Sequence, residues 1–284
     1  MIITKALNAS TGPPMLKHWG VKKYLLIVKN TWDEVFTYRL NFVMWRVRVI
    51  LQILTLYFLW RALLPGNSSI GDYQQSQILT YILGTSIVSA FVLASRSQGI
   101  GDDINQGNLS NILIRPINYF LYWFSKDIGD KAINLLFSIV EISALILIIR
   151  PAVIIQQNQA IILLTALSIV IALIIYFLCN LLLGFIGFWS PETWAPRFLF
   201  FVVINFAAGG LFPLDILPEQ IFSILKFLPF TYLLYFPLKI YLGQLSPQEI
   251  TTGLLIAFVW AAILYLAAKL IWQRGLAIYT AYGR

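Results

Sequence analysis

The sequence predicts an all-α, polytopic membrane protein, because apolar residues are abundant, charges are few, and the apolar residues gather in long runs. Hydrophobic residues make up 59% of the 284 residues and charged residues only 11%, which leaves too little polar surface for a water-exposed globule of this size. Each long run approaches the roughly 20 residues that cross a ~30 Å hydrocarbon core as a helix. We expect six transmembrane helices, an amino-terminal interfacial helix, and an external re-entrant hairpin between spans five and six.

The amino-terminal region is expected to divide into a flexible cytoplasmic segment, 1–20, and an amphipathic interfacial helix, 21–40. Segment 1–20 has no apolar core of the kind that a cleavable signal peptide needs, so the first span should act as the insertion signal. Segment 21–40 carries basic residues and an apolar face at helical spacing, formed by Val21, Tyr24, Leu25, Val28, Trp32, Val35 and Phe36. This composition suits the cytoplasmic membrane interface. The same pattern would also serve a helix packed against another subunit.

Segment 41–284 is expected to form one six-span transmembrane domain. Five runs predict spans on their own: Phe42–Leu64, Ile78–Ser95, Ala132–Ile149, Ala160–Gly187 and Gly253–Trp272. The run Phe198–Phe212 is shorter, and it leads into an aromatic stretch, 213–242, that is interrupted by four prolines. Because proline breaks backbone hydrogen bonding, such a stretch is tolerated at membrane depth only where protein or water covers it. We therefore predict a sixth span followed by a re-entrant or surface hairpin.

The basic residues predict the orientation. With a cytoplasmic amino terminus and six alternating spans, 16 of the 20 Lys and Arg residues fall on or near the cytoplasmic side, and four lie opposite: Arg61, Arg150, Lys226 and Lys239. This positive-inside bias predicts that both termini are cytoplasmic, and we expect a multi-pass protein of the plasma (inner) membrane. The net charge of +8 then reflects topology and attraction to anionic lipid headgroups, and nucleic-acid binding is the weaker explanation.

Between the second and third spans lies the predicted cytoplasmic segment 96–118. Asp102 and Asp103 suit a helix amino terminus, and a short apolar edge follows, formed by Ile104, Leu109, Ile112 and Leu113. A short amphipathic helix in such a place favours a docking element. The alternative is a plain connector, although 23 residues exceed what two adjacent helices need.

Three stretches resemble membrane subunits of type-2 ABC exporters. The residues of segment 96–118 that carry the resemblance are Ile104, Gly107, Leu109, Leu113, Arg115, Pro116, Ile117 and Asn118. The first span is similar to the family at Tyr38, Arg39, Asn41, Phe42, Leu59, Trp60 and Arg61, and the later hairpin at Gly209–Pro218, Leu228–Phe230 and Tyr241–Gly243. The resemblance runs from about Tyr24 to Trp272.

The resemblance implies six spans, cytoplasmic termini and a coupling helix that docks on a cytoplasmic ABC ATPase. The docking residues would be Ile104, Leu109, Ile112, Leu113 and Arg115. It also implies an external hairpin, which we expect to gate substrate release through Gly209, Gly210, Pro213 and Pro218, because glycine permits a tight turn and proline stops a helix. The hairpin aromatics would alternatively form an interfacial belt.

Arg46 and Arg48 depart from the mostly apolar start expected for the first span. We interpret them as anchors whose long stems snorkel to the cytoplasmic interface, with a functional cationic site as the alternative.

No motif for chemistry accompanies the spans. The chain has no Gly-Lys pair for a phosphate-binding loop, and His18 is its only histidine, which excludes HExxH and histidine-based triads. We expect no enzyme activity, metal site or cofactor in this chain, with ATP and Mg²⁺ used by a separate ATPase partner. The predicted function is a permease subunit that pairs with a second, identical or paralogous permease to export an amphipathic organic molecule, drug or lipid. The alternatives are an ATP-independent secondary transporter or channel, which would favour an internal repeat that we do not find, and an intramembrane enzyme.

Glu141 is the acidic residue placed deepest in a span. Asp127, Lys131, Asn134, Ser138 and Glu141 fall on one helical face, and this polar stripe should face other helices or the pathway because lipid cannot solvate it. Glu141 is then either a protonated group bonded to a neighbouring span, near Asn180 or Asn205, or a pathway carboxylate that attracts cationic amphiphiles.

Overall fold

The computed structural model describes residues 20–64, 69–71 and 73–280, and in these ranges the chain is almost entirely helical. The predicted flexible segment 1–20 lies, except for Gly20, outside the described residues. The elements in chain order are α1 (Lys22–Thr37), α2 (Arg39–Leu63), β1 (Ser69–Ile70), β2 (Tyr73–Gln74), α3 (Gln75–Val92), η3 (Ser97–Gly99), α4 (Ile100–Asn105), α5 (Leu109–Leu113), α6 (Tyr119–Ile149), α7 (Gln159–Phe185), η4 (Ile186–Phe188), α8 (Trp194–Ala207), η5 (Leu214–Ile216), α9 (Glu219–Phe227), η6 (Pro229–Tyr232), α10 (Tyr235–Tyr241) and α11 (Pro247–Ile278).

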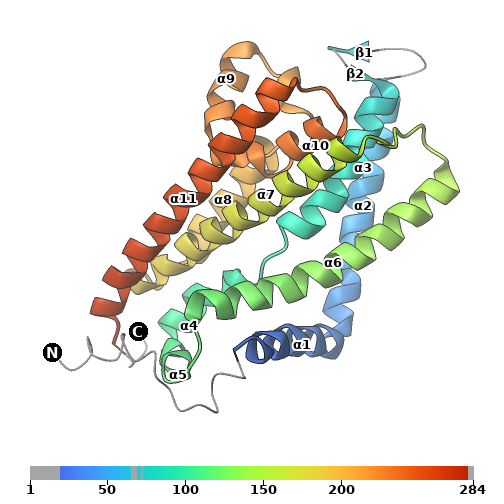
Figure 1. The fold of residues 1–284 in the computed structure, drawn as a ribbon. Helices are drawn as coiled ribbons and strands as arrows, with labels where there is room; N and C mark the ends of the chain where they lie inside the picture. Colours follow the sequence, from blue (N-terminus) through green and yellow to red (C-terminus); the bar gives the residue numbers. More distant parts are fainter. Residues whose placement is uncertain (1–19, 65–68, 72, 281–284) are drawn as a thin grey trace.

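Five helices, α2, α3, α6, α7 and α11, are long and apolar enough to cross a membrane. In Figure 1 they run between an upper end that carries β1, β2 and α9, here called the α9 end, and a lower end that carries α1, α4 and α5, here called the α4–α5 end. The all-α, polytopic fold class is confirmed. The helix α8 has 14 residues and is about 21 Å long, so the sixth span stays a prediction.

Two long helices extend well beyond the predicted spans. The helix α6 begins at Tyr119, not at Ala132, because its charged first half lowers hydropathy without opposing helix formation. The helix α11 begins at Pro247, where Ser246 and Glu249 form a reciprocal capping box and the proline occupies the first turn. Apolar runs therefore located the membrane-compatible parts of these helices and missed their polar ends.

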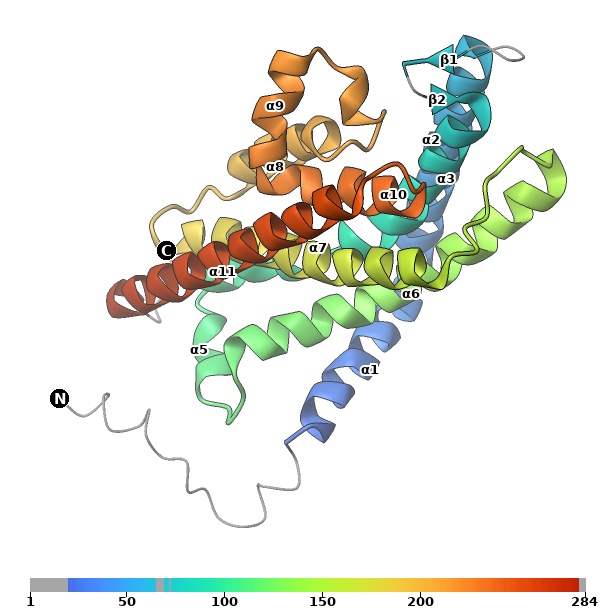
Figure 2. The same ribbon diagram turned by 45° about the horizontal axis from the view of Figure 1, so that its top comes forward.

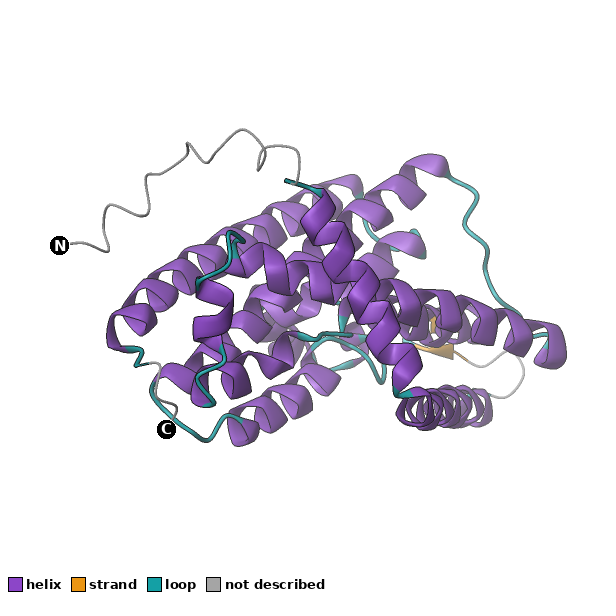
Figure 3. Cartoon of the chain, turned by 90° about the horizontal axis from the view of Figure 1, so that it is seen from below, coloured by secondary structure: helices purple, strands orange, loops and turns teal. Residues whose placement is uncertain are grey.

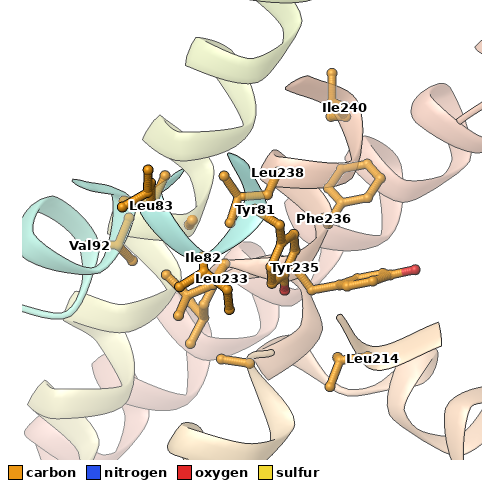
Figure 4. Close-up of a cluster of buried hydrophobic side chains, with 14 of the residues drawn as sticks. Tyr81, Ile82, Leu83, Val92, Leu214, Leu233, Tyr235, Phe236, Leu238 and Ile240 are labelled. Carbon is orange, nitrogen blue, oxygen red and sulfur yellow. The ribbon is translucent and has the colours of Figure 1, made fainter. Parts of the chain in front are cut away.

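The proline-rich stretch after α8 folds into a hairpin of short helices. Figure 2 shows α9 on the outside and α10 returning towards α3 and α7, and none of the residues of α9 is buried. Tyr81, Ile82 and Leu83 of α3 gather beside Leu233 and Leu238 of the hairpin in one hydrophobic core (Figure 4). The predicted hairpin therefore has one exposed arm and one buried arm.

The helix α1 crosses beneath the long helices, as the view from below shows (Figure 3). It packs along α6, and the indole of Trp32 donates a hydrogen bond to the carbonyl of Gly129 at 2.9 Å. Apolar side chains on its other faces, including Leu25 and Phe36, stay exposed. The expected helix is present, and its exposed apolar side is compatible with the predicted interfacial role.

Candidate functional site

A cavity of about 1070 Å³ opens among the long helices. Its wall comes mainly from α2, α3, α7 and α8, so it is called here the α2–α8 cavity. The volume lies at the top of the range of roughly 300–1,000 Å³ that small-molecule sites usually occupy. The cavity is therefore large enough for an amphipathic molecule of lipid or drug size.

The α2–α8 cavity has a charged end and an apolar end. Its charged wall residues lie on α1, at the start of segment 96–118 or on the halves of the longer elements that are nearer the α4–α5 end: Glu34, Arg46, Arg48, Arg96, Asp130 and Arg197. Further along, the wall contains Ile53, Leu56, Phe200, Phe201, Ile204 and Leu234, with Thr85 and Asn205 among them. A molecule inside would meet charge at one end and aliphatic or aromatic surface at the other.

The predicted polar stripe of α6 faces the protein interior. Asp127, Lys131, Asn134 and Ser138 are buried, and the Glu141 side chain is 13% exposed. Since membrane interiors offer no water, each of these groups needs a partner within the protein. The stripe has such partners on α2 and at the end of α3, as predicted for a face that avoids lipid.

Asp127 holds the chain where α3 leads into segment 96–118. Its carboxylate accepts hydrogen bonds from the hydroxyl and backbone N–H of Ser97, both at 3.0 Å, from the backbone N–H of Arg96 at 2.7 Å, and from the hydroxyl of Ser95. These donors surround the amino terminus of η3, where free N–H groups favour an anion.

Lys131 and Asp130 complete this attachment. The Lys131 ammonium donates to the carbonyl of Val92, the last residue of α3, and to that of Ala94 just after the helix. Asp130 forms an ion pair with Arg96 at 2.9 Å. The end of α3 and the start of segment 96–118 are thus fixed to α6 by charged groups.

Glu141 is partnered by Arg46 of α2. The guanidinium makes a bidentate contact with the Glu141 carboxylate, and it also donates to Ser138 at 3.0 Å and to Asn134 at 3.3 Å. The expected partners are wrong, because Asn180 and Asn205 bond to carbonyls of their own helices. Residues of different spans meet here, and helical periodicity within one span does not identify the partner.

The snorkelling interpretation is wrong for Arg46, which is 6% exposed. Arg48, in contrast, is exposed and lies over the ring of Trp45 at 4.7 Å. Arg46 borders the α2–α8 cavity, whereas Glu141 is absent from its wall. The structure therefore does not place Glu141 in contact with a molecule in this cavity.

Segment 96–118 forms two short helices instead of one. They separate at Gly107, whose φ of +77° favours glycine. Ile104, Leu109 and Ile112 are buried in a cluster with residues of α6, α7 and α11, so these three side chains are unavailable to a partner. The expected apolar docking edge is corrected accordingly, because packing within the chain already uses it.

The large apolar side chains of segment 96–118 that remain exposed lie in its last turn. Leu113 is 45% and Ile114 83% exposed, and Arg115 follows them at the surface. Beside them, Asn118 caps α6 by accepting from the N–H of Leu121, and Lys23 of α1 donates to the carbonyl of Pro116. The Arg-Pro-x-Asn pattern thus ends one helix, starts the next and binds α1.

Asp103 is the half-buried acidic group of this segment. Burial raises its pKa, the nearby Lys126 lowers it in part, and Asp102 raises it further. Asn105 and Gly101 bring α4 close to the start of α8: Asn105 donates to the carbonyl of Pro191, and Gly101 lies against Thr193 and Arg197. Segment 96–118 therefore contacts the helix that forms one wall of the cavity.

At the α9 end, the turn after α8 centres on Gly209. Its φ is +78°, and a Cβ there would lie 2.6 Å from the Tyr81 hydroxyl, which donates to the Gly209 carbonyl at 2.7 Å. Trp60 donates to the carbonyl of Leu211 at 3.1 Å. Gly210 has room for a Cβ, so only one of the two glycines is required by the turn.

The predicted role of the two prolines as helix stops is wrong. The helix α8 already ends at Ala207, and Pro213 and Pro218 instead precede η5 and α9. Proline is well suited to a position before a helix because its φ is fixed and it lacks a donor.

Sequence reasoning missed a polar cluster at the α9 end, formed by Tyr73, Asp215, Lys239 and Gln244. The Lys239 ammonium contacts Asp215 and Gln244 at 2.8 Å and the Tyr73 hydroxyl at 3.0 Å, and Tyr73 donates to Asp215 at 2.8 Å. Burial, reinforced by Asp215, raises the pKa of Tyr73 well above its usual value. The available signal was Lys239, which stands among the aromatic residues Tyr235, Phe236 and Tyr241.

The profile of the family described as ABC-2 family transporter protein matches residues 50–283. No curated protein matches the chain. The matched region includes segment 96–118, the hairpin and most of the cavity wall, and it begins after α1. Within the described residues, no group of three or more His, Cys, Asp or Glu side chains could hold a metal ion.

Proposed function

Because this chain belongs to the ABC-2 family of transporter proteins, we propose that it is the permease subunit of an ATP-driven exporter. It moves an amphipathic organic molecule, drug or lipid, and a separate cytoplasmic ABC ATPase supplies the energy from ATP and Mg²⁺. The observation that carries the proposal is the α2–α8 cavity, whose polar and aromatic wall and volume of about 1070 Å³ suit such a molecule.

The proposed ATPase contact is the exposed last turn of segment 96–118. Leu113 and Ile114 offer apolar surface there, while the buried side of α4 and α5 packs on α6, α7 and α11. A push on this turn would reach α3 and α6 through Asp127 and Lys131, and α8 through the close approach of Gly101 to Thr193. Rigid packing of this kind suits the transmission of a rigid-body movement from the ATPase to these helices.

The proposed pathway lies between two permease subunits, identical or paralogous, with the α4–α5 end and both termini in the cytoplasm of a plasma-membrane protein. Large apolar side chains are exposed along the two helices beside the cavity, including Leu51 and Phe58 of α2 and Phe201 and Val202 of α8. In a dimer these would meet the second subunit or lipid. The turn at Gly209 and the hairpin would gate release at the opposite side.

The proposal is tested by purifying the chain in mild detergent from its native membrane and identifying proteins that remain bound. We expect an ABC ATPase to co-purify and to hydrolyse ATP. The double substitution Leu113→Asp and Ile114→Asp should release it, because both side chains are exposed and the fold should be unaffected. The matched control is Ile278→Asp on α11, whose wild-type side chain is 44% exposed at the same end.

The outcomes separate the candidate functions. An intact chain that carries no ATPase, yet transports substrate in vesicles under an ion gradient, would favour the secondary transporter or channel. Retention of the ATPase by the Leu113→Asp and Ile114→Asp variant would reject this docking surface. Substituting Leu109 or Ile112 would not be informative, because these buried residues support the fold itself.

A further inference from the structure

The wall of the α2–α8 cavity carries more positive than negative charge. Its charged residues are four arginines, Arg46, Arg48, Arg96 and Arg197, and two acids, Glu34 and Asp130. Arginine stays charged at any physiological pH. The excess is therefore a fixed property of the cavity.

Two of the four arginines are already neutralised by neighbours. Arg46 is paired with Glu141 and Arg96 with Asp130. Across the described part of the chain, neither Arg48 nor Arg197 forms an ion pair. Arg48 of α2 and Arg197 of α8 are therefore the two arginines of the wall that have no ion pair.

Arg197 shows the strongest need for a partner. Its Nη2 atom is buried and has no hydrogen-bond partner among the described residues. A buried donor without an acceptor is unfavourable, and more so when it is charged. The Arg197 side chain borders the cavity, but this atom lies beside Gly101 of α4, outside the wall, so it is the charge of Arg197, and not this donor, that would attract an anion in the cavity.

We propose that the α2–α8 cavity binds an anionic amphiphile, with its acidic headgroup at Arg48 and Arg197 and its hydrocarbon or aromatic body towards Phe200, Phe201 and Leu234. This inference rests on the proposed function, since it names the substrate class of the same cavity. The head-to-body direction matches the position of the charged wall residues at the α4–α5 end. A carboxylate, phosphate or sulfonate attached to an apolar body has the required chemistry.

The proposed ligand is anionic, whereas a pathway carboxylate at Glu141 would have attracted cationic amphiphiles. That carboxylate is engaged by Arg46 and lies outside the cavity wall. Of the two acids in the wall, Asp130 is paired with Arg96, and Glu34 lies 4.0 Å from Lys126. No acid in the wall therefore remains unpaired for a cationic headgroup.

The anion has two possible sources, an anionic phospholipid of the bilayer or a soluble organic anion. The test uses the intact chain, without ATPase, in phosphatidylcholine nanodiscs. Binding of 1-naphthyl phosphate and of uncharged 1-naphthyl glucoside is measured by calorimetry. Retention of phosphatidylglycerol against phosphatidylcholine is counted by native mass spectrometry after detergent extraction.

The decisive variant is Arg48→Gln with Arg197→Gln, compared with Arg61→Gln plus Arg274→Gln. The control pair removes the same charge from exposed positions outside the cavity wall. We expect the cavity variant to lose about tenfold or more of its preference for the anion, in line with loss of charge-assisted contacts. The control should keep the preference. Arg48→Lys with Arg197→Lys should keep most of it, which separates charge from misfolding.

Preferential retention of phosphatidylglycerol would identify a lipid headgroup, and preference for 1-naphthyl phosphate would identify a soluble anion. Either result, dependent on Arg48 and Arg197, supports the proposal. Absence of both preferences in a monodisperse wild-type sample would overturn the proposal. Equal losses in the cavity and control variants would also overturn it. So would a dimer in which a second copy of the chain fills the cavity. Because no ATPase is needed, the anion site can stand or fall separately from the proposed exporter.

Discussion

The two ends of the bundle carry comparable short helices that are fastened in different ways. At the α4–α5 end, the start of segment 96–118 is held on α6 by the charged groups of Asp127 and Lys131. At the α9 end, the turn after α8 is held by the neutral donors Trp60 and Tyr81, each bonded to a backbone carbonyl. One attachment is ionic and made by a single helix, and the other is neutral and shared by two helices.

The difference between ionic and neutral attachments indicates which parts of the molecule are rigid. Hydrogen bonds to charged groups are about twice as strong as neutral ones, and losing one partner leaves a buried charge that costs several kcal/mol. Segment 96–118 should therefore move with α6 as one body. Neutral bonds of about 1 kcal/mol each can exchange singly, so the turn after α8 is better suited to opening and closing than the start of segment 96–118, while the Lys239–Asp215 ion pair holds a separate part of the α9 end.

The largest effect is expected for Asp127→Ala. The substitution leaves the donors of Ser95, Arg96 and Ser97 without their buried acceptor, and should lower the free energy of unfolding by on the order of 5 kcal/mol. Denaturant titration in mixed micelles measures it. Asp102→Asn, at an exposed position of α4, is the control. If Asp127→Ala changed the free energy of unfolding by less than about 1 kcal/mol, the Asp127 contacts would be no stronger than a neutral hydrogen bond.

The next effect concerns the Arg46–Glu141 pair. Either single substitution, Arg46→Gln or Glu141→Gln, should lower the unfolding free energy by about 3 kcal/mol because a buried partner remains unpaired. Arg46→Met with Glu141→Leu should recover most of this loss. A double-mutant cycle of Arg46→Gln, Glu141→Gln and the two combined would contradict the ion pair if its coupling energy were zero. If Glu141 instead served cationic substrates, Glu141→Gln would weaken their export and leave stability unchanged.

Sequence alone predicted the regular parts of this fold. Five spans, the helix after residue 21, the proline-rich hairpin and the buried polar face of α6 all follow from periodicity and composition, because these features repeat along one element. The family resemblance is confirmed by the match over residues 50–283.

Side-chain contacts between different helices could not be predicted from the sequence. Arg46 and Glu141 are 95 positions apart, and Tyr73 and Lys239 are 166 apart; no local pattern relates such pairs. The apolar edge of segment 96–118 illustrates the same limit, because Leu109 and Ile112 would suit a partner protein and the chain's own core equally well. Only the packing of α5 on α6, α7 and α11 decides between the two.

The turn at the α9 end offers a smaller, internally controlled test. Gly209→Ala should lower the unfolding free energy by about 2 kcal/mol, because alanine disfavours φ of +78° and its Cβ would meet the Tyr81 hydroxyl. Gly210→Ala should change it by less than about 0.5 kcal/mol, since the nearest atom would lie 3.5 Å away. Thermal unfolding of both variants in detergent gives the comparison. Equal effects would contradict the described turn.

The smallest effect should come from Tyr73→Phe, which removes one hydroxyl and keeps the Lys239–Asp215 ion pair. We expect a loss of about 1 kcal/mol at neutral pH.

Burial and Asp215 raise the pKa of Tyr73 in the folded protein, so the folded state holds this proton more tightly than the unfolded chain. Its contribution is full below the unfolded value of about 10 and falls as the pH rises above it. Tyr73→Phe should therefore remove part of the decline in stability that the wild-type protein shows above about pH 10. Tyr265→Phe, at an exposed position of α11, should change neutral-pH stability by less than about 0.5 kcal/mol. An unaltered alkaline profile in Tyr73→Phe would contradict the buried contact between this hydroxyl and Asp215.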